Sequence, residues 1–121
     1  MLEMIDIEID NAVAFQMSGK ITEGDMALVL NVAKEKIARH GSIVLFEKIN
    51  SFSGVEFSAI IEEFKYLLDV GINNIDKVAI LTDKKWIEHI VNIEDKIFKN
   101  MDMKCFSLEE QAQAVAFLKR A

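Results

Sequence analysis

The chain has 121 residues, of which 51% are hydrophobic, with 14 lysines and arginines against 20 aspartates and glutamates. This length is typical of a single globular domain, and we expect residues 1–121 to form one. The net charge of −6 provides no basic surface for phosphate groups, which argues against nucleic-acid binding and against attachment to anionic membranes. Neither an apolar run long enough to span a membrane nor a secretory leader is recognised, so a cytoplasmic location is expected.

Two alternating runs open the chain and predict an antiparallel hairpin. The apolar members are Ile5, Ile7 and Ile9 in the first run, and Val13, Phe15 and Met17 in the second. Alternation with a period of two places such residues on one face of a strand. The Asp10-Asn11 pair between the runs is expected to form the turn.

A capping box marks the start of the first predicted helix. Thr22 is followed three residues later by Asp25, so each side chain can accept a hydrogen bond from the other residue's backbone N–H. The apolar residues that follow have the spacing of one buried helix face: Met26, Val29, Leu30, Ala33 and Ile37. His40 and Gly41 are expected to end the helix, because histidine suits the negative helix end and glycine adopts a positive φ.

The rest of the chain alternates strands with helices. Apolar runs at residues 42–49, 77–81 and 103–106 predict three strands, the first of them buried on both faces. Capping boxes at Ser53 with Glu56 and at Ser107 with Glu110 predict two helices, and another is expected to follow Asp83 as its N-cap. The expected apolar helix faces are Phe57, Ile60, Ile61, Phe64, Leu67 and Leu68, ending at Gly71, then Trp86, Ile87, Ile90 and Val91, and finally Leu108, Ala112, Val115 and Ala116.

The resulting order is β-β-α-β-α-β-α-β-α, which predicts an α/β fold with a mixed, mostly parallel sheet. Strands that alternate with helices are joined by right-handed crossovers, and these crossovers place the helices on the sheet.

Residues for catalysis, cofactor binding or metal binding are not found at workable spacings. The five glycines lie far apart, whereas a phosphate-binding loop needs them clustered at a helix start. His40 and His89 are on different predicted helices without partners at metal-ligand spacing. Cys105, the single cysteine, is interpreted as a small buried hydrophobe in a reducing compartment, and paired acids such as Glu62-Glu63 as solvated helix faces. We therefore expect no enzyme activity, cofactor or metal.

The loop after the strand at residues 42–49 is the strongest candidate for a functional site, because sites in parallel α/β sheets gather at the carboxyl ends of strands. The candidate residues are Asn50, Ser51, Phe52, Ser53 and Gly54, with Asp83 and Trp86 from the loop after the next strand. Ser53 has two open interpretations, a helix cap and a phosphorylation site whose negative charge a helix start would favour. Phe52 and Trp86 are each open between a contact at this site and packing on the core.

With these residues in place, the chain resembles the SpoIIAA-like family, small bacterial proteins that share the STAS (sulfate transporter and anti-sigma-factor antagonist) fold and are related in shape to CRAL-TRIO lipid-binding domains. The likeness covers nearly the full length. It rests on six segments in the same order: Gly19-Lys20-Ile21-Thr22, residues 43–46, Phe52-Ser53-Gly54, residues 77–81, Asp83-Lys84-Lys85-Trp86 and residues 112–118. The resemblance implies a sheet of four or five strands with helices mainly on one side.

In anti-sigma-factor antagonists the second helix begins with an Asp-Ser-Ser-Gly-like phosphorylation motif, and this sequence matches only Ser53-Gly54 of it. The resemblance therefore implies a non-catalytic regulatory or protein-interaction module, with Ser53 as the candidate phosphorylation site. The alternative is a carrier or sensor of a small hydrophobic ligand or lipid, held in a CRAL-TRIO-like cavity. The expected partner is an unidentified protein or such a ligand, and a homodimer is left open.

Overall fold

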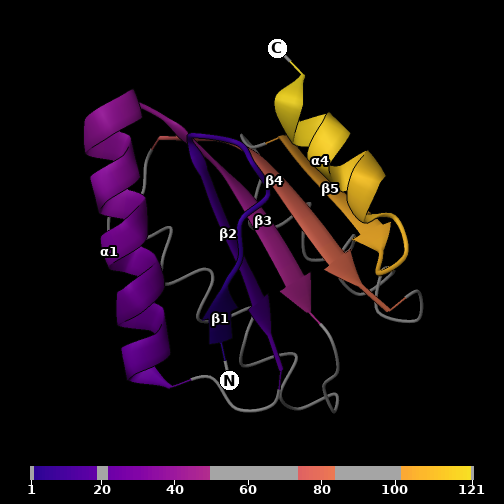
Figure 1. Cartoon of the computed structure of the whole chain (residues 1–121), viewed down its shortest axis with the longest axis horizontal. Coiled ribbons are helices and arrows are strands. Elements are labelled where there is room, and N and C mark those ends of the chain that lie inside the picture. The colour runs from indigo at the N-terminus through magenta and orange to yellow at the C-terminus, as the bar shows by residue number, and fades with distance from the viewer. Residues whose placement is uncertain (1, 19–21, 50–73, 84–101, 121) are drawn as a thin grey trace.

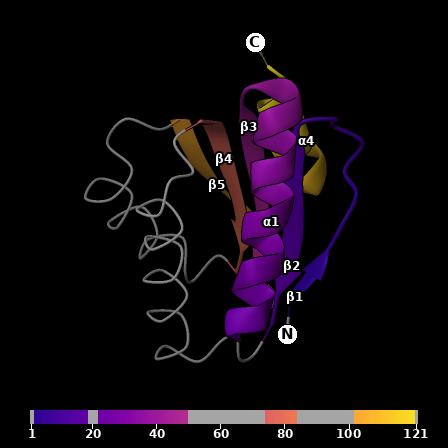
Figure 2. The same ribbon diagram turned by 90° about the vertical axis from the view of Figure 1, so that its left-hand side faces the viewer.

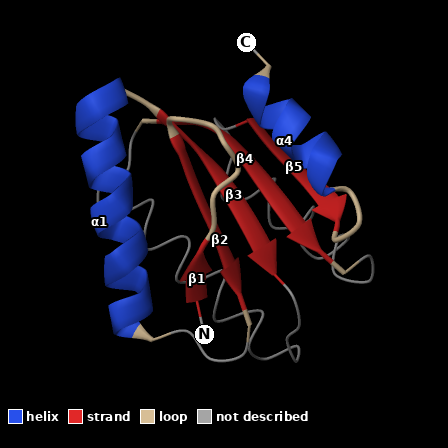
Figure 3. Cartoon of the chain, viewed as in Figure 1, coloured by secondary structure: helices blue, strands red, loops and turns tan. Residues whose placement is uncertain are grey.

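The computed structural model describes residues 2–18, 22–49, 74–83 and 102–120, and these residues form one five-stranded sheet with two helices (Figures 1 and 3). The elements in chain order are β1 Leu2–Met4, β2 Ala12–Met17, α1 Glu23–His40, β3 Ile43–Ile49, β4 Ile75–Thr82, β5 Asp102–Ser107 and α4 Gln111–Lys119. The helices predicted to begin near Ser53 and after Asp83 lie outside the described residues.

The sheet is mixed and mostly parallel, as predicted. Its strands lie in chain order, with β1 antiparallel to β2 and all other neighbours parallel. The four parallel strands therefore finish along one side of the sheet, where Met17, Ile49, Thr82 and Ser107 are their last residues. We call this side the carboxyl end of the sheet. The opposite side, where Ala12, Ile43, Ile75 and Asp102 begin these strands, is its amino end (Figure 1).

The described helices cover opposite faces of the sheet, with α1 in front of it and α4 behind it in Figure 2. The buried residues of the α1 face are Leu2, Val13, Phe15, Met17, Val29, Ala33, Ile43, Leu45, Ile49, Val78, Ile80 and Met103. Those of the α4 face are Ile7, Ala12, Ala14, Val44, Phe46, Ala79, Leu81, Phe106, Ala114, Phe117 and Leu118. Helices were expected mainly on one side, but the described pair is divided one to each face.

The predicted hairpin is present, but its first strand lies elsewhere than expected. β1 comprises Leu2–Met4 and pairs with Phe15 to Met17, whereas the alternating isoleucines belong to a connecting segment, residues 5–11. Glu8 interrupts the extended chain there, because it has a φ of 61° and its N–H donates to Asp6 Oδ1 at 2.8 Å. The isoleucines are nevertheless buried or half-buried against the α4 face, so their alternation reflects burial of a loop.

Helix α1 begins and ends as predicted. Thr22 is its N-cap, and both hydrogen bonds of the capping box with Asp25 are present, at 3.1 Å and 3.0 Å. The bond from the Thr22 backbone N–H lowers the pKa of the Asp25 carboxyl. Gly41 ends the helix with a φ of 85°, and its N–H donates to the Ile37 carbonyl at 2.7 Å. Neither described helix is long and apolar enough to cross a membrane.

The three strands predicted after the hairpin, β3, β4 and β5, are confirmed within two residues of their ends, but α4 starts later than expected. Ser107 stays in β5 as the partner of Thr82, so it does not act as the N-cap. Only half of the predicted capping box forms, in which the Ser107 N–H donates to Glu110 Oε1 at 2.9 Å. The helix begins at Gln111, and its buried residues are Ala114, Phe117 and Leu118. Half of the predicted face was wrong, since Ala112 and Ala116 are exposed, whereas Leu108 and Val115 are half-buried against the α4 face.

A lysine of β4 hydrogen-bonds the last residues of α4 to the amino end of the sheet. Lys77 Nζ donates to the backbone carbonyls of Phe117 at 3.1 Å and Arg120 at 2.7 Å. The same ammonium lies 5.1 Å from the centre of the Phe117 ring, which in turn packs on Phe106 with ring centres 6.0 Å apart. A cation at the end of a helix satisfies carbonyls that have no partner within the helix.

Candidate functional site

The carboxyl end of the sheet brings together the starting points of the two predicted loops. Lys48 of β3 is the register partner of Leu81 of β4, so the next residues, Ile49 and Thr82, end the two strands side by side. Asp83 follows Thr82 and is exposed. The other candidate residues lie outside the described part of the chain and stay predictions: Asn50, Ser51, Phe52, Ser53, Gly54 and Trp86.

A buried glutamate lies just before this end of β3. Glu47 is only 2% exposed, and in the sheet it stands between Phe15 of β2 and Ile80 of β4. It belongs to the α1 face, because it alternates with Leu45 and Ile49 of that face. Burial among apolar neighbours raises the pKa of the Glu47 carboxyl to about 8. The carboxyl is therefore mostly protonated near neutral pH, and it can donate a hydrogen bond.

A second buried polar group lies on the neighbouring strand. Thr82 is fully buried, and its Oγ1 has no hydrogen-bond partner in the described part of the chain. It follows Val78 and Ile80 at a period of two, so it also faces α1. Since Glu47 is level with Ile80, the Cα atoms of Glu47 and Thr82 are diagonal neighbours roughly 8 Å apart, from the spacing between strands and the rise along them.

The last described strand extends this polar patch. Ser107 is the register partner of Thr82 and is buried, and Cys105, the partner of Ile80, is half-buried. Cys105 packs against the α1 face, which agrees with its interpretation as a small hydrophobe. We call the four residues Glu47, Thr82, Cys105 and Ser107 the polar floor, since they lie on one face of the sheet near its carboxyl end.

The polar floor is suited to hydrogen bonding. A protonated carboxyl and a hydroxyl are both donors and acceptors, and in an apolar surrounding each gains more from a partner than it would in water. Among the described residues, no group of three or more histidine, cysteine, aspartate or glutamate side chains could hold a metal ion.

Sequence reasoning proposed this end of the sheet as the site but did not single out Glu47 or Thr82. Glu47 left a signal, because it is the one charged residue in the alternation Ile43, Leu45, Glu47, Ile49 of a strand predicted to be buried on both faces. Thr82 left none, since a threonine that ends a strand before an aspartate also suits an ordinary turn.

Comparison with known proteins assigns the chain to a family by its sequence. The pattern of the SpoIIAA-like family matches residues 12–119, which cover all described elements except β1. No curated protein and no solved structure matches the chain.

Proposed function

The chain belongs to the SpoIIAA-like family, and from this membership we propose that it is a non-catalytic regulatory module that binds a protein partner at the carboxyl end of its sheet. The binding surface comprises the loops that follow β3 and β4, with Asn50, Ser51, Phe52, Ser53 and Gly54 on the first and Asp83 and Trp86 on the second. The pathway is left open by the family relationship.

The proposal is supported above all by the Thr82 hydroxyl, which is buried and has no hydrogen-bond partner among the described residues. A buried hydroxyl without a partner costs about 1–3 kcal/mol of stability, and valine would fit the same strand position without this cost. Thr82 immediately precedes the exposed Asp83, at the end of the sheet where sites gather in parallel α/β folds. Since Thr82 and Glu47 are closed off from solvent in the free chain, a partner reaches them through a rearrangement of this end. In the bound state, the Thr82 hydroxyl then gains the partner that it lacks among the described residues, and the Glu47 carboxyl can bond to the same partner.

Ser53 supplies a means of regulation in this proposal. A phosphate there would add about −1.5 to −2 charges near Glu56 and the acids of the following segment, so it would change the affinity for a charged partner. Aspartate is itself a good N-cap. The Ser53→Asp variant is therefore expected to fold normally and to change binding, whereas Ser53→Ala is expected mainly to lose a cap.

The test begins with a pull-down that identifies the partner, followed by affinity measurements on four variants. Thr82→Val is expected to weaken binding about fivefold, the equivalent of one neutral hydrogen bond, while the free protein becomes more stable. Asp83→Lys is expected to weaken binding further. Asp102→Lys is the matched control, since Asp102 is an exposed aspartate at the amino end of β5, and it should leave the affinity unchanged. Ser53→Asp should change the affinity and Ser53→Ala should not.

Unchanged affinity in Thr82→Val, Asp83→Lys and Ser53→Asp would remove the carboxyl end from the interface. Native mass spectrometry of the purified protein separates the alternative function, since a copurified small hydrophobic molecule would identify a carrier or sensor. The same spectrum reports the number of subunits.

A further inference from the structure

The antiparallel strand β1 forms one margin of the sheet and leaves one side of its backbone without a neighbouring described strand. The sheet order begins with β1, and Figure 2 shows it on the outside, next to β2. A strand in this position presents N–H and C=O groups that another strand can use. This margin is the outer side of β1, whereas the site discussed above lies at the ends of β3 and β4.

The register identifies which backbone groups are open. The Ile5 N–H donates to the Ala14 carbonyl at 2.9 Å, so Ile5 directs its backbone N–H toward β2, as a residue of a hydrogen-bonded pair does. In an antiparallel ladder such pairs alternate with pairs that are not hydrogen-bonded, and therefore Glu3 also bonds toward β2. The N–H and C=O groups of Leu2 and Met4 then point outward, away from β2.

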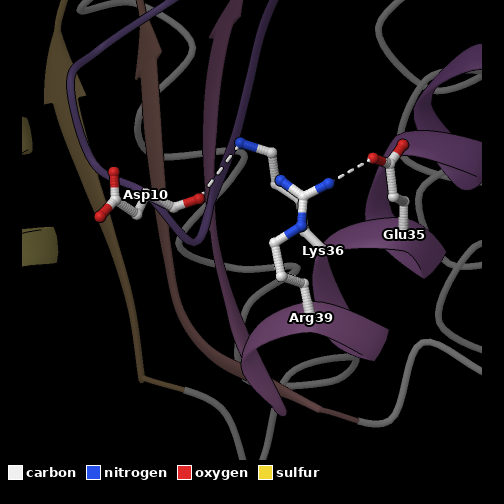
Figure 4. Close-up of polar contacts among 4 residues, drawn as sticks. All are labelled: Asp10, Glu35, Lys36 and Arg39. Carbon is white, nitrogen blue, oxygen red and sulfur yellow. Dashed lines mark hydrogen bonds and ion pairs between the residues drawn. The ribbon is translucent and has the colours of Figure 1, made fainter.

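An apolar cleft opens where β1 ends and residues 5–11 leave the sheet. Its volume is about 340 Å³, and Met4, Ile5, Ile9 and Val32 are among the residues that line it. Lys36 of α1 also lines it and reaches over to the connecting segment, where its Nζ donates to the Asp10 carbonyl at 3.3 Å (Figure 4). A groove with open strand groups and an adjoining apolar cleft has the two parts needed to bind an extended peptide by strand addition.

The two faces of this margin differ in polarity, one being apolar and the other acidic. This difference determines which sequence pattern a bound strand should have. On the α1 face, β1 carries the buried Leu2 and the half-buried Met4. The cleft beyond them is lined from both faces, by Val32 and Lys36 of α1 and by α4-face residues such as Ile5. On the α4 face it presents the exposed Glu3. Three more exposed acids follow at Asp6, Glu8 and Asp10, and no basic residue occurs among residues 2–11. A strand that adds here is matched by apolar side chains on the α1 face and cationic side chains on the α4 face.

We propose that the β1 margin binds an extended segment of a protein partner in which apolar residues alternate with lysines or arginines. The backbone of this segment bonds to Leu2 and Met4, one of its apolar side chains fills the cleft, and its cations face Glu3 and the neighbouring acids. Pairing with a second copy of this chain in the antiparallel register about Glu3 is unfavourable, because it would set that carboxylate directly opposite its own counterpart.

The probe is a capped synthetic heptapeptide in which lysine alternates with valine and isoleucine. It is titrated into the ¹⁵N-labelled full chain and followed by NMR. The largest shift changes are expected at the amides of Leu2 and Met4, and the binding should weaken at high salt. Two control peptides have the same length, one with glutamate in place of every lysine and one with N-methyl groups on its valines. Loss of two backbone hydrogen bonds should weaken the N-methylated peptide about tenfold or more.

Two variants of the protein complete the test. Glu3→Lys should weaken the lysine peptide about fivefold and improve the glutamate peptide, since an attractive cross-strand pair becomes repulsive. Glu109→Lys makes the same change at an exposed residue before α4 and should have no effect. Shift changes away from β1, or equal binding of the N-methylated and unmodified peptides, would overturn the proposal. These measurements use no natural partner, so they fail or succeed independently of the function proposed for the carboxyl end.

Discussion

The two ends of the parallel sheet satisfy their polar groups in different ways. At the amino end, the hydroxyl of Ser42 donates to Asp76 at 2.7 Å, and Asn11 Nδ2 donates to the Ser42 carbonyl at 3.3 Å. At the carboxyl end, the Thr82 hydroxyl is buried without a partner in the described part of the chain, and Glu47 is kept protonated by its apolar surroundings. The hydrogen bonds at the amino end thus stabilise the fold, whereas the buried polar groups at the carboxyl end lower its stability. This contrast is the physical basis of the proposal that a partner binds at the carboxyl end.

The largest expected effect concerns Glu47 and pH. Its pKa is raised from 4.5 to about 8 in the folded chain, so between these values the folded state holds one proton more than the unfolded state. Stability therefore falls as pH rises through this window, by at most about 1.4 kcal/mol per pH unit. The loss is absent below pH 4.5 and complete above pH 8. Urea titrations from pH 5 to 8.5 should show this slope in the wild type and a flatter profile in Glu47→Gln.

Glu109→Gln is the matched control for that experiment, because it changes an exposed glutamate. Its profile should follow that of the wild type. Parallel profiles for all three proteins would mean that Glu47 is paired or solvated, and the contrast between the two ends would lose its main support.

Lys77→Met tests the amino end. Loss of the two hydrogen bonds to the carbonyls of Phe117 and Arg120 should destabilise the domain by about 1.5 kcal/mol, since bonds from a charged donor are worth more than neutral ones. Lys104→Met is the control, because Lys104 places its ammonium 5.3 Å from the Phe106 ring and should cost only about 0.5 kcal/mol. Equal losses in urea titration would show that the two carbonyl contacts contribute nothing.

Thr22→Ala should cost about 1 kcal/mol. Thr22 caps α1, which starts after β2 at the carboxyl end, so this variant removes a hydroxyl that is in use. Circular dichroism during urea unfolding should show a lower midpoint. An unchanged midpoint would mean that the capping box adds no stability.

Thr82→Val removes a hydroxyl at the same end that makes no hydrogen bond to a described residue. The free protein should become more stable by about 0.5–1 kcal/mol, because the buried unpaired group is replaced by a methyl group. Ser42→Ala sharpens the comparison, since its hydroxyl is bonded to Asp76 and its loss should destabilise by about 0.5 kcal/mol. A loss of stability in both variants would mean that the Thr82 hydroxyl makes a stabilising hydrogen bond, as the Ser42 hydroxyl does.

The sequence was informative wherever a local pattern and its burial agreed. The unbroken apolar run predicted β3, and the Thr22 capping box predicted the start of α1, because both features act over a few residues. The first strand was misplaced because alternation in Ile5, Ile7 and Ile9 reports burial, and a loop can bury such residues as well as a strand can. The left-handed conformation of Glu8 is rarely adopted by a residue other than glycine, so the sequence held no sign of it.

At the candidate site, the sequence predicted the position but not the energetics. Topology alone placed Asp83 directly after β4, whose end lies beside the end of β3. The burial of Glu47 and the missing partner of Thr82 depend on which side chains pack around them, and that is set by contacts between distant parts of the chain. The start of α4 was misplaced for the same reason, since pairing with Thr82 holds Ser107 in β5.

The α4 face joins residues from both ends of the chain, with Ile7 near the start and Leu118 near the end in one buried cluster. During synthesis, α1 can pack on β2 and β3 as soon as these neighbouring segments have left the ribosome. Among the described residues, the α4 face gains its helix only when α4 emerges, so apolar positions such as Phe46 and Leu81 lack that helix in the nascent chain. Contacts this distant in sequence form late and slowly. Chains truncated before α4 should therefore be bound by chaperones or degraded. Packing of α4 on the sheet is the late step that buries this face.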